Sequence, residues 1–319
     1  KEITLAQFGI QLEPMWGFAY DDFVRIARKA ECTGFNSLWV SDHLFLDMES
    51  VDRNCFEAWT ILTALATVTK DLRLGTLVTC NSYRLPAMLA RIAAGCDQIS
   101  GGRLEFGIGA GWKKLEYQAY GIPFLPIATR VKQLEEAIRL IRRLWTEDRV
   151  SFEGEHYCLN EAICTPKPVQ KPLPIWIGGA EEKRLLPLVA ELADGWNMLP
   201  GVPLKEVEGK MQALRRLCNE RGRNLDTIRK SLFVEVILAD NKRELIQFST
   251  ELARKLGEKG EEIVERAIKV GTAGTPSKVA ERLREFQGLS FQEFIIMFPY
   301  GHEEEMLSRF IEMVAPELT

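Results

Sequence analysis

A polar triplet, Ser41-Asp42-His43, directly follows a short apolar run at 37–40. Histidine donates or accepts a proton near neutral pH, and a neighbouring carboxylate tunes that exchange. The triplet therefore predicts a proton-transfer site on His43 with Asp42 beside it; a histidine that only caps a loop is the alternative. Glu13, near the end of an earlier apolar run, is either a further acid for this site or a solvated loop carboxylate.

A glycine-rich segment, Gly107-Ile108-Gly109-Ala110-Gly111, stands directly before Trp112. Glycine has no Cβ, so a flat ring or a phosphate can approach this backbone closely; tight strand packing is the alternative use. A dinucleotide-binding fingerprint requires a third glycine where Trp112 stands, and a helix that begins at once. We therefore assign no Rossmann site to this segment.

A second glycine pair lies in Ile177-Gly178-Gly179-Ala180, which precedes a predicted helix. Backbone amides at the start of a helix bind phosphate well. Lys183 and Arg184 favour such a site, whereas Glu181 and Glu182 would repel an anion or compete for the helix dipole. The segment is therefore a candidate phosphate site, although the two glutamates next to it oppose phosphate binding.

Short apolar runs alternate with segments of helical periodicity along the chain, which is the pattern of β-α units around a parallel sheet. The predicted strands are 5–12, 37–40, 72–79, 104–108, 175–177, 195–198, 231–238 and 291–297. The predicted helices include 56–69, 86–99, 130–145, 183–193, 204–221, 243–270 and 303–314. Eight such units predict an α/β fold of the (β/α)8 TIM-barrel type, whose active site lies at the carboxyl ends of the strands.

We expect one domain over 1–319, with irregular excursions at 112–129 and 147–174. The second excursion is an insertion before strand five and contains a predicted hairpin at 150–157. The rival architecture is a doubly wound sheet with a second domain. No shift in composition marks a boundary for it.

The composition excludes several classes of function. The chain has 319 residues, 41 Lys+Arg and 45 Asp+Glu, and hence a formal charge of −4, which argues against a dedicated nucleic-acid binder. No polybasic run favours a membrane surface, and the first residues given do not have the pattern of a signal peptide. Seven cysteines without a C-x-x-C pair, three histidines and no H-E-x-x-H predict reduced thiols, no metal site and a cytoplasmic location.

Taken together, these segments resemble the bacterial-luciferase-like flavin and deazaflavin oxidoreductases, and within them the branch that uses the 5-deazaflavin coenzyme F420. The resemblance covers nearly the whole chain. It rests on Trp39-Val-Ser-Asp42-His43, Leu74-Gly-Thr-Leu-Val78, Phe106-Gly-Ile-Gly-Ala-Gly-Trp112 with Glu116 and Gly121, Pro166-Lys-Pro168, Ile177-Gly-Gly179, Ala193-Asp-Gly-Trp-Asn197 and Gly274-Thr-Pro276.

The resemblance implies a set of roles. It implies a cis peptide bond between Leu77 and Val78. It also implies a catalytic group in which His43 transfers the proton, Asp42 positions His43 or the cofactor, and Glu13 assists the proton transfer. The residues that it assigns to the cofactor are Asp42, Leu77, Val78, Thr79, Gly109, Ala110, Gly111, Gly178, Gly179 and Ala180. One departure concerns the substrate: sugar-phosphate dehydrogenases of this family carry an acid where Trp112 stands, so a sugar phosphate is disfavoured.

The leading hypothesis is hydride transfer between F420 and a small organic substrate. The alternative is an FMN-dependent monooxygenase that uses dioxygen and a partner flavin reductase. Two further readings are a cofactor carrier without turnover and a sugar-processing barrel in which Asp42 and Glu13 are paired acids. The resemblance also allows a homodimer.

Overall fold

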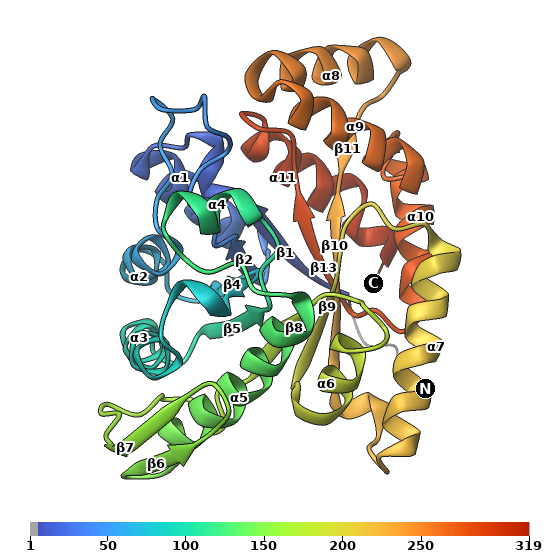
Figure 1. The fold of residues 1–319 in the computed structure, drawn as a ribbon. Coiled ribbons are helices and arrows are strands. Elements are labelled where there is room, and N and C mark those ends of the chain that lie inside the picture. The colour runs from blue at the N-terminus through green and yellow to red at the C-terminus, as the bar shows by residue number, and fades with distance from the viewer. Residues whose placement is uncertain (1–5, 319) are drawn as a thin grey trace.

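Eight parallel strands form the centre of the molecule, in a computed structural model that describes residues 6–318. Their order is β3-β2-β1-β13-β10-β9-β8-β5, and a pairing between β3 and β5 closes the sheet into a barrel (Figure 1). This confirms the predicted (β/α)8 barrel. The strands are β1 Gln7–Leu12, β2 Ser37–Val40, β3 Arg73–Thr76, β5 Leu104–Gly109, β8 Ile175–Gly178, β9 Gly195–Met198, β10 Arg229–Glu235 and β13 Glu293–Met297. Leu5, the first residue of the predicted strand 5–12, lies outside the described residues.

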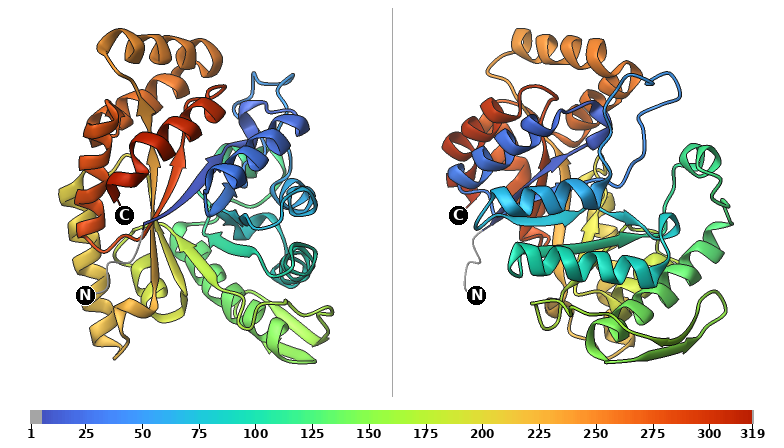
Figure 2. Two further views of the ribbon diagram at one scale, coloured as in Figure 1. Left: turned by 180° about the vertical axis from the view of Figure 1, so that it is seen from behind. Right: turned by 90° about the vertical axis from the view of Figure 1, so that its left-hand side faces the viewer.

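Helices surround the strands on the outside (Figures 1 and 2). They bury one apolar side against the barrel, as in α1, where Phe23, Ile26, Ala27 and Ala30 recur at helical spacing and are all buried. The helices of this layer are, in chain order, α1 Tyr20–Thr33, α2 Ala58–Val68, α3 Pro86–Ser100, α5 Ile127–Thr146, α6 Leu185–Leu192, α7 Leu204–Glu220, α10 Pro276–Gly288 and α11 Glu303–Met313.

The inside of the barrel is filled in layers. Trp39, Leu77, Trp176 and Ile295 form an apolar cluster separate from the main core. Nearer the amino ends of the strands, the buried carboxylate of Glu105 accepts hydrogen bonds from Trp176 Nε1 at 2.6 Å and from Arg229 Nη1 at 2.9 Å, with Arg73 also bound. These layers fill the barrel interior, so we expect a ligand to bind at the carboxyl ends of the strands.

The third barrel strand is interrupted. Predicted at 72–79, it consists of β3 and a short β4, Thr79–Cys80, which pairs with β5. The peptide bond between Leu77 and Val78, at the interruption, is cis, as the resemblance implied.

The two excursions contain more regular structure than predicted. The prediction of an irregular 112–129 is wrong for α4, Lys114–Ala119, and for the first residues of α5. The insertion before β8 carries a hairpin of β6 and β7, Val150–Glu153 and Cys158–Ala162, so the second strand begins beyond the predicted 150–157. The single-domain assignment stays a prediction.

The region between β10 and β13 also differs in detail. The helical segments predicted over 243–270 are two helices, α8 Lys242–Leu256 and α9 Glu258–Val270, which are separated at Gly257, where φ is 59° and ψ is −141°. A two-stranded parallel sheet of β11 and β12, Ile237–Leu238 and Ala273–Gly274, brackets them. Within residues 6–318, no helix is both long enough and apolar enough to cross a bilayer.

Candidate active site

His43 lies just beyond the carboxyl end of β2, and its imidazole contacts the carboxylate of Glu116 from α4. The Nδ1 atom is 3.2 Å from Glu116 Oε1 and 3.1 Å from Oε2. An ionised carboxylate only accepts hydrogen bonds, so Nδ1 carries the proton, and a neutral His43 has its lone pair on Nε2. In the part of the chain that the structure describes, no hydrogen-bond partner is recorded for Nε2, and the side chain is 15% exposed. His43 can therefore exchange a proton with a ligand through Nε2.

Glu116 is held in place by several donors. Its side chain is fully buried and accepts hydrogen bonds from the Tyr83 hydroxyl at 2.6 Å, the Leu44 amide at 2.8 Å and Lys113 Nζ at 3.1 Å. Burial favours the neutral acid, but His43 and these donors outweigh it and lower the pKa of Glu116 to about 2. Glu116 is therefore a fixed negative charge that orients the imidazole.

Trp112 borders the other side of His43. The two rings meet edge to face, with centroids 5.5 Å apart. The indole is 69% exposed, so it has a large free apolar surface next to the imidazole. A ligand that reaches Nε2 of His43 is therefore expected to contact the indole as well.

Asp42 takes part in a different set of contacts from its neighbour. Its carboxylate receives two hydrogen bonds from Arg84, at 2.6 and 2.8 Å, and one from the Cys80 amide at 2.9 Å. Burial raises the pKa of Asp42, and the guanidinium of Arg84 opposes that change. The expectation that Asp42 positions His43 is wrong, because Glu116 occupies that place. Contact between Asp42 and a cofactor stays a prediction.

Glu13 extends β1 into the mouth of the barrel. It is buried, its Oε1 accepts a hydrogen bond from Gln11 Nε2 at 3.0 Å, and its Oε2 accepts one from the Ser41 hydroxyl. Burial raises the pKa of Glu13, which His43 partly opposes through its charge. The alternative of a solvated loop carboxylate is excluded by this burial. The carbonyl of the Gln11 side chain is buried and has no hydrogen-bond partner among residues 6–318, so it offers the mouth a free acceptor.

Val78 lies against the glycine-rich backbones of β5 and β8. A Cβ on Gly109 would lie 2.7 Å from Val78 Cγ2, and one on Gly178 would lie 2.9 Å from Val78 Cγ1. These glycines therefore make room for Val78, which is the strand-packing use of the motif. Thr79 is fully buried, and its hydroxyl accepts a hydrogen bond from Trp59 Nε1 at 2.8 Å.

Replacing Gly178 with alanine is expected to lower the free energy of unfolding by about 2 kcal/mol, because the new Cβ overlaps both methyl groups of Val78. Gly209→Ala in α7 is the matched control: its Cβ would meet no atom within 4 Å, and it should stabilise by about 0.5–1 kcal/mol. Urea unfolding measures both. A Gly178→Ala protein as stable as the parent contradicts this packing.

The rest of the glycine loop is fixed by Arg130. Its guanidinium donates to the carbonyl of Ala110 at 3.1 Å and to that of Gly111. Gly111 has a φ of 74°, and a Cβ there would lie 2.0 Å from the Tyr117 hydroxyl. The loop that carries Trp112 past His43 is therefore held in one conformation.

Three backbone amides in the turn between β8 and α6 are hydrogen-bonded to other groups of the protein. The Gly179 amide donates to the Asn197 carbonyl at 3.1 Å. The Glu181 carboxylate accepts from the amides of Lys183 and Arg184 at 3.2 and 2.8 Å. α6 begins at Leu185 and not at the predicted residue 183, because Arg184 has a non-helical φ of −129°. Ala180 is buried beside this turn.

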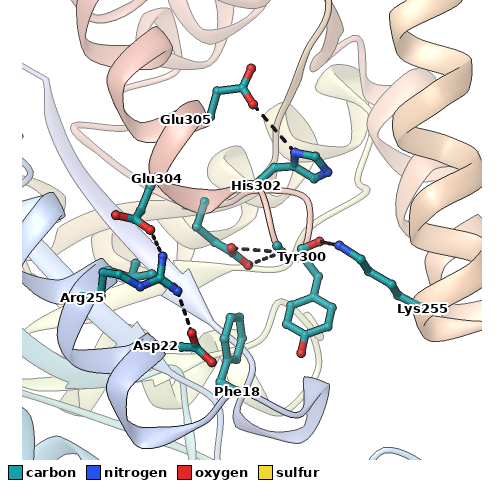
Figure 3. Close-up of a pocket in the computed structure, with 11 residues that line it drawn as sticks. Phe18, Asp22, Arg25, Lys255, Tyr300, His302, Glu304 and Glu305 are labelled. Atoms are coloured by element: carbon teal, nitrogen blue, oxygen red, sulfur yellow. Dashed lines mark hydrogen bonds and ion pairs between the residues drawn. The ribbon is translucent and has the colours of Figure 1, made fainter.

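Two polar cavities lie beside the barrel mouth, outside the His43 site. One, of about 450 Å³, lies between α1 and α11 (Figure 3). Its charged groups already have partners: Arg25 binds Asp22 and Glu304, and Lys255 donates to the Tyr300 carbonyl at 2.9 Å. The other, of about 610 Å³, includes Arg53, which bonds to the carbonyls of Trp16 and Lys255. Over residues 6–318, no three His, Cys, Asp or Glu side chains gather in a metal-binding arrangement.

The residues that position the site were missed by sequence reasoning. They are Tyr83 and Lys113, which hold Glu116, and Arg84, which holds Asp42. Glu116 appeared in the sequence only as a marker of the resemblance. The signal that the sequence offered for Glu116 was its position four residues after Trp112.

Comparisons with known proteins agree with this fold. Residues 3–293 match the model of a family described as luciferase-like monooxygenase. An F420-dependent glucose-6-phosphate dehydrogenase of Kineococcus radiotolerans is 28% identical, over 94% of each chain. An FMNH2-dependent dimethylsulfone monooxygenase of Pseudomonas putida is 25% identical, over 96% of this chain and 90% of its own. The solved structure of an F420-dependent secondary alcohol dehydrogenase with an F420-acetone adduct has a TM-score of 0.85 at 18% identity, over 99% of both chains.

Proposed function

Because this chain belongs to the luciferase-like monooxygenase family of oxidoreductases, we propose that it transfers a hydride between coenzyme F420 and a small organic substrate. The observation that carries the proposal is the His43–Glu116 pair, which combines a free imidazole nitrogen with a fixed carboxylate at the carboxyl ends of the strands. The relatives named as F420-dependent support the choice of cofactor.

The residues at the barrel mouth fit a flat, phosphate-bearing cofactor in most respects. Val78 is half-buried and lies between glycine backbones, where it can form one wall for a ring. The turn at Gly178, Gly179 and Ala180 would lie near the phosphate, and Asp42 would lie near the ring. When bound, the deazaflavin would supply the hydride chemistry at its C5 position.

The protein's own residues would handle the proton that accompanies the hydride. If an alcohol is oxidised, His43 Nε2 accepts the hydroxyl proton; if a carbonyl is reduced, the imidazolium gives a proton to the developing alkoxide. Glu116 stabilises the imidazolium in both directions. Glu13, whose burial raises its pKa, would act as a second proton donor or acceptor in the mouth of the barrel. The apolar face of Trp112 beside His43 favours small uncharged alcohols and carbonyl compounds over sugar phosphates.

A second candidate function is an FMN-dependent monooxygenase that uses dioxygen and reduced flavin from a partner reductase. The dimethylsulfone monooxygenase, which matches over almost the whole chain, favours it. The same wall at Val78 and the same histidine would serve the flavin.

The two functions are separated by titrating the purified protein with F420 and with FMN while following ring fluorescence. We expect F420 to bind at least tenfold more tightly than FMN. Hydride transfer is then assayed with a panel of small alcohols and ketones by the change in deazaflavin absorbance. Tighter binding of FMN than of F420 would support the FMN-dependent monooxygenase instead. Binding of neither ring, by protein whose fold circular dichroism has verified, would refute both.

A further inference from the structure

In the turn before α6, the carboxylate of Glu181 accepts hydrogen bonds from two backbone amides. Glu181 Oε2 accepts a hydrogen bond from the Arg184 amide at 2.8 Å, and Oε1 accepts one from the Lys183 amide at 3.2 Å. The Arg184 guanidinium lies 3.6 Å from Oε1. Two backbone amides and a cation before a helix are the groups that bind a phosphate. The carboxylate of Glu181 therefore occupies donors that a cofactor phosphate needs.

Gly179 of this turn is fixed by β9. The Gly179 amide is bonded to the Asn197 carbonyl at 3.1 Å, and the Gly179 carbonyl accepts from Trp196 Nε1 at 2.7 Å. Gly179 has a φ of 118°, which a residue with a Cβ rarely adopts. The backbone of the turn is thus held by β9. Of its donors, the two amides on Glu181 can change partner by the rotation of one side chain, which is 40% exposed.

The next acid in the sequence is arranged differently. Glu182 Oε1 accepts a hydrogen bond from Lys210 Nζ of α7 at 3.0 Å. In the described part of the chain, no backbone amide of the turn donates a hydrogen bond to Glu182. The two neighbouring glutamates therefore carry equal charge and differ in whether they occupy the amides.

We propose that Glu181 is an internal competitor for the cofactor phosphate, and that it limits the affinity of this protein for phosphate-bearing cofactors. A phosphate and a carboxylate cannot share the same two amides, because both accept and both are negative. A phosphate that takes these two amides therefore displaces the Glu181 side chain, which frees the Arg184 guanidinium to pair with the phosphate. This inference rests on the proposed function, because it places the phosphate at this turn.

The test compares ring compounds that carry the phosphate with ring compounds that lack it. Parent protein, Glu181→Gln and Glu182→Gln are titrated with FMN and riboflavin, and with F420 and its phosphate-free deazaflavin precursor, by ring fluorescence. We expect Glu181→Gln to tighten binding of the phosphate-bearing member about tenfold and to leave the phosphate-free member unchanged. Glu182→Gln, which removes the same charge one residue away, should change neither by more than about twofold. Glu181→Ala, which empties the amides completely, should behave as Glu181→Gln does.

Three outcomes overturn the inference. An unchanged ratio of affinities between the paired cofactors in Glu181→Gln shows that the phosphate binds elsewhere, while the proposed function survives. Weaker binding of the phosphate-bearing member, with an unchanged melting temperature, shows that Glu181 assists the phosphate. Equal tightening in Glu182→Gln shows a general charge effect. Failure of every ring compound to bind any of the proteins refutes the proposed function itself, and this inference with it.

Discussion

Replacing His43 with glutamine lowers kcat/KM by about 10²- to 10⁴-fold, while the dissociation constant of the cofactor stays within about twofold of the parent value. That range is the usual contribution of a positioned general acid or base. Glutamine retains a hydrogen-bonding side chain of similar reach but cannot accept and release a proton near neutral pH. The loss therefore falls on the chemical step, which is measured by deazaflavin absorbance under single-turnover conditions with the substrate that the alcohol and ketone panel identifies.

His302 provides the matched control for this substitution. It lies at the start of α11, where Nε2 is 2.7 Å from Glu251 Oε2, and it lines the cavity beside α1 (Figure 3). His302→Gln should keep kcat/KM within about threefold of the parent. Full activity in His43→Gln, or an equal loss in both variants, contradicts the role of His43.

The barrel could be predicted from sequence because its determinants are local. Parallel strands covered on both faces appear as short apolar runs, such as 37–40 and 175–177, and each helix shows its own periodicity. The boundaries that failed depend on contacts outside the element. α6 begins only at Leu185, after a turn in which Gly179 is hydrogen-bonded to β9, and the third strand was divided where Val78 packs against Gly109 and Gly178.

The candidate site was predictable only in part, because adjacency in sequence is not adjacency in space. Asp42 precedes His43, but successive side chains at the end of a strand face opposite sides. Asp42 therefore meets Arg84 from the end of the next strand, and His43 meets Glu116, 73 residues further along the chain. Glu116 belongs to α4, a short helix in a segment predicted to be irregular, so no periodic pattern placed it near the barrel mouth.

Replacing Glu116 with glutamine is expected to lower the free energy of unfolding by about 3 kcal/mol at pH 7. The pKa of Glu116 falls from 4.5 to about 2 on folding, and each pKa unit corresponds to about 1.4 kcal/mol. Because the folded pKa is the lower one, this stabilisation is complete above about pH 5 and is lost as the pH falls toward 2. The parent and the variant should therefore differ most at neutral pH and converge near pH 2. Urea unfolding at several pH values between 2.5 and 7 measures the difference.

The same substitution also tests how Glu116 acts on His43. A glutamine amide cannot neutralise the imidazolium, so kcat should fall about 10- to 100-fold while KM changes little. Glu135→Gln is the control, because it removes one charge from an exposed pair with Arg139 on α5 and should change stability by less than about 1 kcal/mol. A stability difference between Glu116→Gln and parent that does not shrink on acidification would mean that the carboxylate charge is not its source. In that case Glu116 would contribute to stability through packing. The assignment of Glu116 as a fixed negative charge behind His43 would then have to be abandoned.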